Sequence, residues 1–347
     1  MKSYTLYTLK IAPISPFLTP LESDTLFGHI CWALEYLGGF TGSKNLTNFL
    51  GEFDKQYPPL IMTNAFPAGY LPFPLLPPFT SEEKLDLRGR FLNKGKGDEF
   101  GFIQWLKELS RQEYIALDTF FQYRHAFSKY DLYAAVLEGT LSGNRFSKVS
   151  QDSLAELPGC ESQTVEVYHN AIDRITGTVK EGQLFSKNST FYKEDVKFHV
   201  YLKTGYFTIE ELEKIFEYIS MNGYGADKST GSGRFEFELE PGVPFNDIED
   251  FNAYLLLSNT HPRVLQRHSS YYTTQTKFGK LGGTFSTNSK YSPFKYPVIL
   301  LNPGSVILTQ ESVEFFGENF KEVHPQLSQV RHYGIGYPVK MRLKNEL

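Results

Sequence analysis

The residues best suited to chemistry lie in one glycine-rich stretch, GYGADKSTGSGRF, from Gly223 to Phe235. Glycine permits positive φ and a close approach of another molecule to the main chain, and successive N–H groups in such a turn form an anion-binding nest. The candidate phosphate-binding residues are Gly223, Gly225, Lys228, Ser229, Thr230, Gly231, Ser232, Gly233 and Arg234. Composition alone leaves two interpretations open, a phosphate site and a glycine-rich turn without a ligand.

Two nucleotide-binding motifs do not fit this stretch. A P-loop requires a glycine directly before the Lys-Ser/Thr pair and runs from strand to helix, whereas Asp227 precedes Lys228 and the predicted order here is helix, loop, strand. A dinucleotide fingerprint must open a helix, so the same order argues against it. The loop therefore predicts neither a nucleoside triphosphate nor a dinucleotide site.

A capped helix and a strand must position this loop. Thr208 and Glu211 form a capping box, and Ile209, Leu212, Ile215, Phe216 and Ile219 recur at helical spacing. Residues 234–240 alternate as a strand after the loop. Strand, helix, glycine loop and strand make half of a ferredoxin-like βαββαβ unit, the architecture of RNA-recognition domains. A strand at residues 4–11 and a helix beginning at Ser23 as its N-cap supply the other half or begin a similar unit.

Composition narrows the class of protein. The 347 residues carry a formal net charge of −4, which argues against a protein that coats nucleic acid indiscriminately. The 30 Phe and 22 Tyr exceed what a core alone suggests, and stacked bases use such rings. Cys31 and Cys160 form no C-x-x-C pair, so no zinc site, other metal site or cofactor is signalled, and a reducing cytoplasm is expected. No secretory or membrane-spanning segment is apparent in the sequence, and we expect a soluble protein.

Several further segments have a predicted conformation. Short helices are expected at residues 46–53, 102–109 and 130–141, the last two as an elaboration of the first domain. The Pro-rich, apolar residues 58–79 predict an extended surface excursion that packs on the chain itself or on a partner. Residues 84–96 gather five cations against Asp86 and predict a charged linker.

The sequence turns to β structure from Thr164 onward. Strands are predicted at residues 183–191, 196–202, 254–257, 298–301, 305–309 and 337–343. His169 and Asn170 precede a long polar hairpin tip that contains Asp173 and Arg174. A basic segment from Asn259 to Lys295 contains no acidic residue. Its cations, interleaved with Tyr271, Tyr272 and Phe278, predict either a single-strand nucleic-acid surface or a flexible basic loop; they are Arg263, Arg267, Lys277, Lys280, Lys290 and Lys295.

Taken together, these stretches resemble the RAMP proteins of CRISPR effector complexes, most closely subunit four of the type III-A Csm complex, which is Cas-five-like. The resemblance runs nearly end to end and is carried by SDTLFGHICWAL, NAFPAGYLPFP, HNAIDRITGT, the glycine loop, LLLSNTHP, PGSVILT and HYGIGYPV. Their joint order and spacing identify the family, although Ala226 and Asp227 stand where a more basic character is expected.

The resemblance implies an α+β fold of two ferredoxin-like (RRM-like, RAMP) domains with inserted helices. Residues 1–160 would form the first domain with its Pro-rich and helical insertions, residues 161–240 would complete its sheet, and residues 241–347 would form the second domain. It also implies a non-catalytic, cytoplasmic subunit that caps the crRNA 5′ handle and joins backbone RAMP subunits to the large signalling and nuclease subunit, near target RNA. The glycine loop would contact the crRNA backbone, and the residues His169, Asn170, Asp173 and Arg174 would lie near RNA or a neighbouring subunit. Arg263, Lys277 and Lys280 complete the predicted RNA-binding set.

Two other functions remain open. The relatives include Cas-six-like and Cas-five-like endoribonucleases that process precursor crRNA without a metal, and such cleavage needs a general base and acid around a ribose 2′-OH. The histidine candidates are His29, His125 and His169; His29 is expected to pack within its helix, and His169 is the best placed. A purely structural assembly subunit is the third possibility, which the glycine loop and the basic segment disfavour.

Overall fold

The computed structural model describes residues 4–40, 44–141, 146–148, 161–170, 185–286 and 290–344. Its main sheet has the strand order β10-β1-β9-β2, and every neighbouring pair is antiparallel. The strands are β1 (Thr5–Pro13), β2 (Leu60–Met62), β9 (Phe198–Thr204) and β10 (Phe235–Pro241), with β3 (Phe66–Pro67) also paired to β9. Alternation along β1 buries Tyr7, Leu9 and Ile11.

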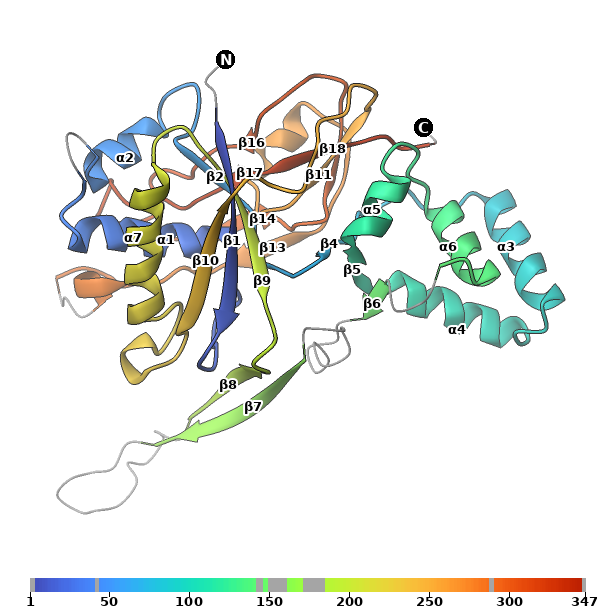
Figure 1. The fold of residues 1–347 in the computed structure, drawn as a ribbon, viewed down its shortest axis with the longest axis horizontal. Coiled ribbons are helices and arrows are strands. Elements are labelled where there is room, and N and C mark those ends of the chain that lie inside the picture. The colour runs from blue at the N-terminus through green and yellow to red at the C-terminus, as the bar shows by residue number, and fades with distance from the viewer. Residues whose placement is uncertain are drawn as a thin grey trace.

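Helices α1 (Ser23–Tyr36) and α7 (Ile209–Asn222) pack side by side against this sheet (Figure 1). Leu26, Ile30 and Leu34 place an apolar stripe of α1 in the core. The predicted Thr208–Glu211 capping box is present on α7. Chain order gives strand, helix, strand twice, β1-α1-β2 and β9-α7-β10, which confirms the predicted α+β class.

Helix α1 differs from the prediction at its start. Glu22 occupies the N-cap position without a side-chain cap, and Ser23 is the first helical residue. The reason is that Ser23 is fully buried and its backbone N–H donates to Asn64 Oδ1 at 3.0 Å. A side chain from another segment thus satisfies an orphan donor of the helix terminus. Helix α2 (Leu46–Glu52) follows as predicted, capped by Asn45.

A helical lobe lies beside the sheet (Figure 1). It contains α3 (Ser81–Asn93), α4 (Glu99–Ser110), α5 (Leu117–Tyr123) and α6 (Lys129–Glu138), with a small sheet of β4 (Tyr70–Pro72), β5 (Gln112–Ala116) and β6 (Phe146–Lys148). The predicted helices α4 and α6 are confirmed. The prediction of a charged linker over residues 84–96 is wrong, because Leu87 and Phe91 bury one face of α3 while its cations point outward.

The Pro-rich stretch 58–79 is also different from its prediction as a surface excursion. Leu60, Ile61, Met62 and Leu71 are fully buried, and Phe66 is nearly so. Strands β2, β3 and β4 fall within it, and its apolar side chains fill the core between the main sheet and its neighbours. Burial of this apolar surface outweighs the poor fit of proline to a regular sheet.

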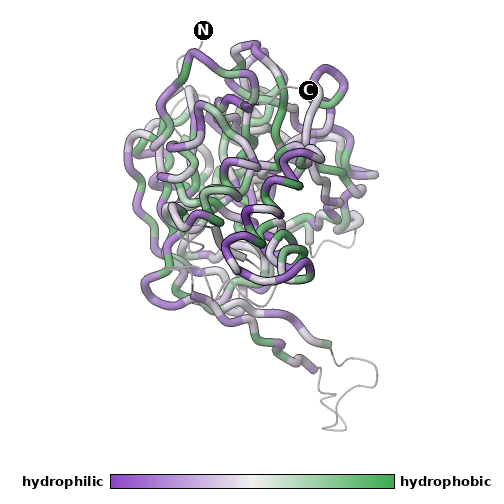
Figure 2. Tube along the Cα trace, turned by 90° about the vertical axis from the view of Figure 1, so that its right-hand side faces the viewer, coloured by the Kyte–Doolittle hydropathy of each residue, from purple (hydrophilic) through white to green (hydrophobic). Residues whose placement is uncertain are grey.

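A two-stranded hairpin of β7 (Ser162–His169) and β8 (Phe185–Tyr192) projects from the main body (Figures 1 and 2). Reciprocal backbone hydrogen bonds between Phe17 and Thr190 attach its base to the segment before α1. Four large apolar side chains of the hairpin are exposed, namely Val165, Tyr168, Phe185 and Phe191. The hairpin therefore offers a surface that the described part of the chain leaves uncovered.

The last third of the chain forms a second sheet of order β12-β15-β11-β18. Its strands are β11 (Ala253–Leu256), β12 (Ser270–Tyr271), β15 (Val306–Leu308) and β18 (Pro338–Met341). Two further sheets have two strands each. One pairs β13 (Thr274–Lys277) with β14 (Val298–Leu301), and the other pairs β16 (Phe316–Gly317) with β17 (Ile335–Gly336). Within the described residues after 240, helical structure is limited to the 3-10 turns η4 (Pro262–Gln266) and η5 (Gly283–Ser286). The two helices expected of a second ferredoxin-like unit are thus replaced there by loops and short turns.

One hydrophobic core joins both parts of the chain. It contains Leu9 and Ile30 from the first part together with Leu255, Tyr333 and Val339 from the last. The domain division at residue 240 stays a prediction. Among the described residues, no helix combines the length and apolarity needed to cross a membrane.

Candidate nucleic-acid interface

The glycine loop is a closed structure pinned to the segment before α1. Helix α7 ends at Asn222, and Tyr224 then donates its backbone N–H to the Gly233 carbonyl at 2.8 Å. Gly233 in turn donates to the Pro16 carbonyl at 2.8 Å. The Tyr224 ring is fully buried, and its hydroxyl donates to the Pro20 carbonyl at 2.8 Å. Hydrogen bonds within the chain therefore hold the two ends of the loop together, and no ligand is needed to close it.

Three of the loop glycines are required by this packing. A Cβ on Gly223 would lie 2.4 Å from the Ser232 carbonyl oxygen, and one on Gly233 would lie 2.0 Å from the Tyr224 carbonyl oxygen. Gly225 approaches Thr19 in the same way, at 2.6 Å. All three have positive φ. Gly231, with a φ of +96°, faces open space and needs glycine only for its backbone conformation.

His29 anchors the loop from α1. Its Nε2 accepts the Gly225 N–H at 2.9 Å, and its ring lies 4.8 Å from that of Tyr224. Burial, with a smaller contribution from the Lys228 charge, lowers the pKa of His29 to about 3. The imidazole is therefore neutral and free to accept. The expectation that His29 has a structural role is met through a hydrogen bond that the sequence does not reveal.

Most backbone donors of the loop are satisfied internally. Thr230 and Ser232 donate to the Asp227 carbonyl at 3.0 and 3.4 Å, Gly231 donates to the Lys228 carbonyl at 3.1 Å, and Arg234 donates to Ser15 Oγ at 2.7 Å. Three consecutive N–H groups, those of Asp227, Lys228 and Ser229, have no partner within the described part of the chain. The region able to bind an anion through its backbone is thus narrower than the thirteen-residue stretch suggests.

Two cationic side chains flank these three donors. Lys228 is half-buried, and desolvation lowers its pKa. Arg234 is exposed at the start of β10. Neither side chain has a carboxylate partner among the residues that the structure describes. Ser229 is exposed beside them, whereas the Thr230 hydroxyl already donates to the Asp227 carbonyl at 2.8 Å.

An ion pair joins the loop to the projecting hairpin. Lys187 on β8 contacts both carboxylate oxygens of Asp227, at 2.7 and 2.5 Å. Asp227 has a left-handed backbone with a φ of 56°, which an Asp or Asn tolerates better than other side chains do. Asp227, which stands where the resemblance predicts a more basic character, therefore fixes the loop next to β8. Sequence spacing gives no sign of this pair.

The other predicted hairpin residues are only partly described. His169 ends β7, and the exposed Asn170 follows it. Asp173, Arg174 and the His169 side chain lie outside the described residues.

Acidic residues from elsewhere in the chain neutralise two cations of the basic segment. Arg263 Nη1 lies 2.7 Å from Glu318 Oε1. Lys277 forms a short ion pair with Glu22 and lies 3.6 Å from Asp24 Oδ2. Lys280 instead lies over the Phe294 ring, 6.0 Å from its centroid. The absence of acids within residues 259–295 therefore does not make this surface uniformly basic.

A buried polar cluster, unnoticed in the sequence, underlies the start of α1. Asp24 accepts a hydrogen bond from Asn259 Nδ2 at 2.8 Å, and His332 Nε2 lies 3.3 Å from Asp24 Oδ2. Asn64 Nδ2 donates to Asn259 Oδ1 at 3.2 Å. Asp24, His332 and both asparagines are at most 8% exposed, so a ligand does not reach them. The cluster joins the two parts of the chain.

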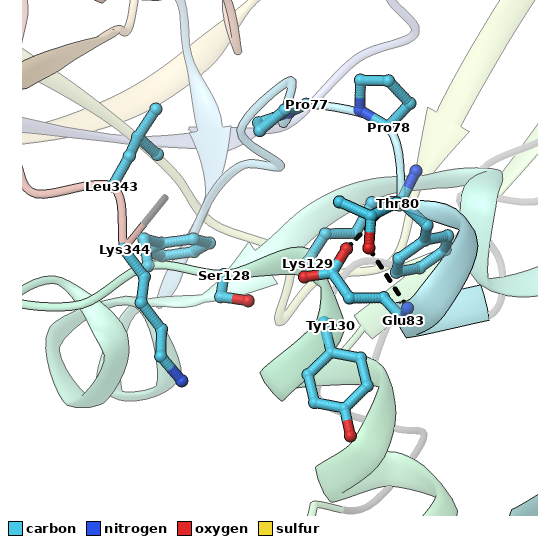
Figure 3. A pocket seen from close by; sticks show the side chains of 11 residues that line it. Pro77, Pro78, Thr80, Glu83, Ser128, Lys129, Tyr130, Leu343 and Lys344 are labelled. Atoms are coloured by element: carbon cyan, nitrogen blue, oxygen red, sulfur yellow. Dashed lines mark hydrogen bonds between the residues drawn. The ribbon is translucent and has the colours of Figure 1, made fainter. Parts of the chain in front are cut away.

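One cavity of about 430 Å³ lies between the Pro-rich stretch, α6 and the end of the chain (Figure 3). Lys129 lies over the Phe79 ring at 4.9 Å, and Glu83 accepts the Thr80 N–H as part of a capping box. No residue of the predicted RNA-binding set lines this cavity. In the described residues, no three His, Cys, Asp or Glu side chains gather as the ligands of a metal would.

Comparison with known proteins relates the fold to solved structures. No protein-family profile matches the sequence, and no curated protein does. A chain of the crystal structure of a Csm1-Csm4 cassette in complex with AMPPNP is 16% identical, with 99% of this chain and 100% of that chain covered and a TM-score of 0.52. A chain of the Csm3-Csm4 subcomplex of the type III-A CRISPR-Cas interference complex is 14% identical, with coverages of 97% and 99% and a TM-score of 0.51. The resemblance stated from the sequence is thus confirmed at the level of the fold.

Proposed function

We propose that this chain is the Csm4-like subunit of a type III-A CRISPR-Cas effector complex and that it binds the crRNA 5′ handle. The support from the fold is that both similar structures are covered almost completely, and Csm4 is the component that their two names share. Among the sequence motifs that resemble the RAMP proteins, one is the glycine loop, one begins α1, and three contribute Asn64, Asn259 and His332 to the buried polar cluster.

We also propose that the first part of the chain is a ferredoxin-like unit. The strand order β10-β1-β9-β2, with two strand-helix-strand units and only antiparallel neighbours, favours this assignment. For the last third, only the resemblance to the RAMP proteins supports the same assignment. Its described residues have strands and 3-10 turns in place of α-helices.

The single observation that carries RNA binding is the unpaired donor set of the glycine loop. The N–H groups of Asp227, Lys228 and Ser229, the Lys228 ammonium and the Arg234 guanidinium all lack an internal partner among the described residues. Desolvation of Lys228 makes an uncompensated ammonium unfavourable, and a phosphate oxygen would relieve that cost. A phosphate of the crRNA backbone is the ligand that suits this set.

The proposed partners are the counterparts of Csm1 and Csm3, with target RNA bound in the assembled complex. The test is to co-express this chain with both counterparts and a crRNA, and to weigh the purified assembly by native mass spectrometry. We expect a particle that contains all three proteins and RNA, and nuclease footprinting should show protection of the 5′ handle. Assembly of the other subunits with crRNA, handle protected, in the absence of this chain would argue against the proposal.

We propose that the subunit is not an enzyme. The Nε2 lone pair of His29 accepts the Gly225 N–H, so this nitrogen is not available as a general base. His125 is exposed on the helical lobe, away from the loop. His169 keeps the metal-independent nuclease as the alternative. Incubation of the purified chain with repeat RNA in EDTA decides between them, since a discrete product that disappears in a His169→Ala variant would establish the enzyme.

A further inference from the structure

The β13–β14 ribbon exposes an unusual amount of apolar surface. Phe278 is 77% exposed, Phe294 60%, Ile299 53% and Tyr296 51%. Exposure alternates along the first strand, so that Thr274, Thr276, Phe278 and Lys280 face outward while the residues between them face the protein. We call the outward side, with Thr276, Phe278, Lys280, Phe294, Tyr296 and Ile299, the ribbon face.

The opposite side of the ribbon carries polar side chains next to the buried Val298 and Leu300. Gln275 donates to Asn259 Oδ1 at 2.9 Å, Lys277 pairs with Glu22, and the Lys295 ammonium donates to the Arg331 carbonyl at 3.3 Å. Burial lowers the pKa of Lys295. Two lysines therefore point into the protein while two phenylalanines point into solvent, which departs from the usual pattern of a half-buried ribbon.

The ribbon cannot turn over to correct this pattern. Val298 and Leu300 on its inner side pack with Val323 in a small core. Strand pairing continues past β13, because Lys295 donates its backbone N–H to the Gly279 carbonyl at 2.8 Å. In the connecting loop, the backbone at Gly283 approaches Trp32 of α1 so closely that a Cβ would lie 2.7 Å from the ring. These attachments hold the ribbon face toward solvent.

We propose that the ribbon face is a docking surface for another protein subunit, one that presents an apolar centre and a carboxylate opposite Lys280. Exposed aromatic side chains with few charges are typical of the buried centre of a protein interface. Lys280 supplies the charge, and it has no carboxylate partner in the described part of the chain. The partner is expected in the complex of the proposed function, on which this inference rests.

RNA fits the same surface less well. Nucleic-acid interfaces are strongly positive, and a phosphate backbone needs several available cations. Three nearby cations of the basic segment, Arg263, Lys277 and Lys295, are committed to internal partners. Lys280 alone remains on the face, and Ile299, which is 53% exposed, offers no ring on which a base could stack. The structure thus separates a protein-docking face from the phosphate site at the glycine loop.

The test measures the affinity of this chain for the recombinant counterparts of Csm1 and Csm3, each immobilised separately, by biolayer interferometry. The variant is Phe278→Ser with Phe294→Ser, and the matched control is Phe100→Ser with Ile103→Ser on α4, where the two side chains are 65% and 50% exposed. We expect the ribbon variant to lose at least about tenfold in affinity for one subunit, as truncated interface anchors do. The control should bind as the wild type does. Lys280→Glu should weaken binding to the same subunit, because the new carboxylate would repel the partner's carboxylate.

A second measurement locates the contact on the wild-type chain, so it remains informative if the variant does not fold. Hydrogen exchange of the wild-type chain should slow over residues 274–280 and 294–301 when the subunit binds. Unchanged affinity and unchanged exchange would overturn the docking face while leaving the proposed function intact. Loss of crRNA affinity in the ribbon variant, with protein affinity intact, would show RNA to be the occupant and would also overturn it. If the wild-type chain binds neither subunit, both proposals fail.

Discussion

His332 Nε2 lies 3.3 Å from the Asp24 carboxylate, and both side chains are almost fully buried. The two residues come from opposite ends of the sequence, one from the first turn of α1 and the other from the strand region before β17. Asp24 is the only carboxylate of the described residues that Asn259, Lys277 and His332 all approach. This charged centre links the helix that supports the glycine loop to the ribbon that carries the docking face.

Replacing Asp24 by Asn should destabilise the fold. Burial raises the pKa of Asp24, but the contact with His332 and the Lys277 charge outweigh it and lower the pKa to about 2. The charged partner of Asp24 is Lys277, whose ammonium lies 3.6 Å from the Asp24 carboxylate, and removal of one partner of a buried ion pair costs about 3 kcal/mol or more. We expect urea unfolding of Asp24→Asn at pH 7 to show that loss. Glu22→Gln is the control, since Glu22 is less buried and should cost less than about 1 kcal/mol. Equal losses would contradict a special role for Asp24.

Acid should loosen the glycine loop through His29. Its folded pKa of about 3 lies below the unfolded value near 6.5, so the unfolded chain binds more protons between these values. Stability from this group is complete above pH 6.5 and falls as the pH drops toward 3, with a slope of up to about 1.4 kcal/mol per pH unit. His29→Gln keeps an acceptor but does not titrate. A pH series of unfolding free energies should be shallower for this variant, and an unchanged slope would contradict the assignment.

Two glycines of the loop should differ sharply in their tolerance of alanine. Gly233→Ala places a Cβ 2.0 Å from the Tyr224 carbonyl oxygen, so the loop must rearrange. Gly231→Ala meets no atom and incurs only the cost of a positive φ, about 1 kcal/mol. We expect Gly233→Ala to lower the thermal midpoint clearly more than Gly231→Ala does. Similar midpoints for the two variants would show that the loop is not packed as described.

Asp227→Asn should strengthen RNA binding. The carboxylate would repel a phosphate bound beside Lys228, it neutralises Lys187, and an Asn would retain the left-handed backbone. We expect the affinity for crRNA to rise by about twofold to fivefold at low salt, with the gain fading as salt screens it. Asp195→Asn, an exposed aspartate in the turn after β8, serves as the control and should change little. A loss of affinity would mean that the ion pair holds the binding geometry.

The sequence predicts the region around the glycine loop well because its signals are local. The Thr208–Glu211 box, the apolar spacing of α7 and the alternation of β10 each need only a few neighbouring residues. Glycines at positions 223 and 233 are not by themselves a sign of a ligand, since their missing Cβ atoms make room for the loop's own backbone. Composition cannot distinguish these two uses of glycine.

Long-range pairing accounts for what the sequence does not predict. The segment around Lys277 has no acid of its own, and only the fold brings Glu22 and Asp24 to it. Lys187 and Asp227 meet because a hairpin crosses a loop. The Pro-rich stretch has a correct local signal, its apolarity, but whether such a segment is buried within one chain or against another depends on the assembled core.

The central claim, that the glycine loop binds the crRNA backbone, is tested most directly by fluorescence anisotropy of a labelled crRNA at several salt concentrations. Lys228→Glu with Arg234→Glu is compared with Lys84→Glu and Lys107→Glu, two exposed lysines of α3 and α4 that give the same change in net charge. We predict that the loop variant loses at least about tenfold in affinity and that its salt slope falls by about 1.4, the value for two phosphate contacts on a single strand. The control should keep the affinity and the salt slope of the wild type. A loop variant with the affinity and salt slope of the wild type would contradict the claim.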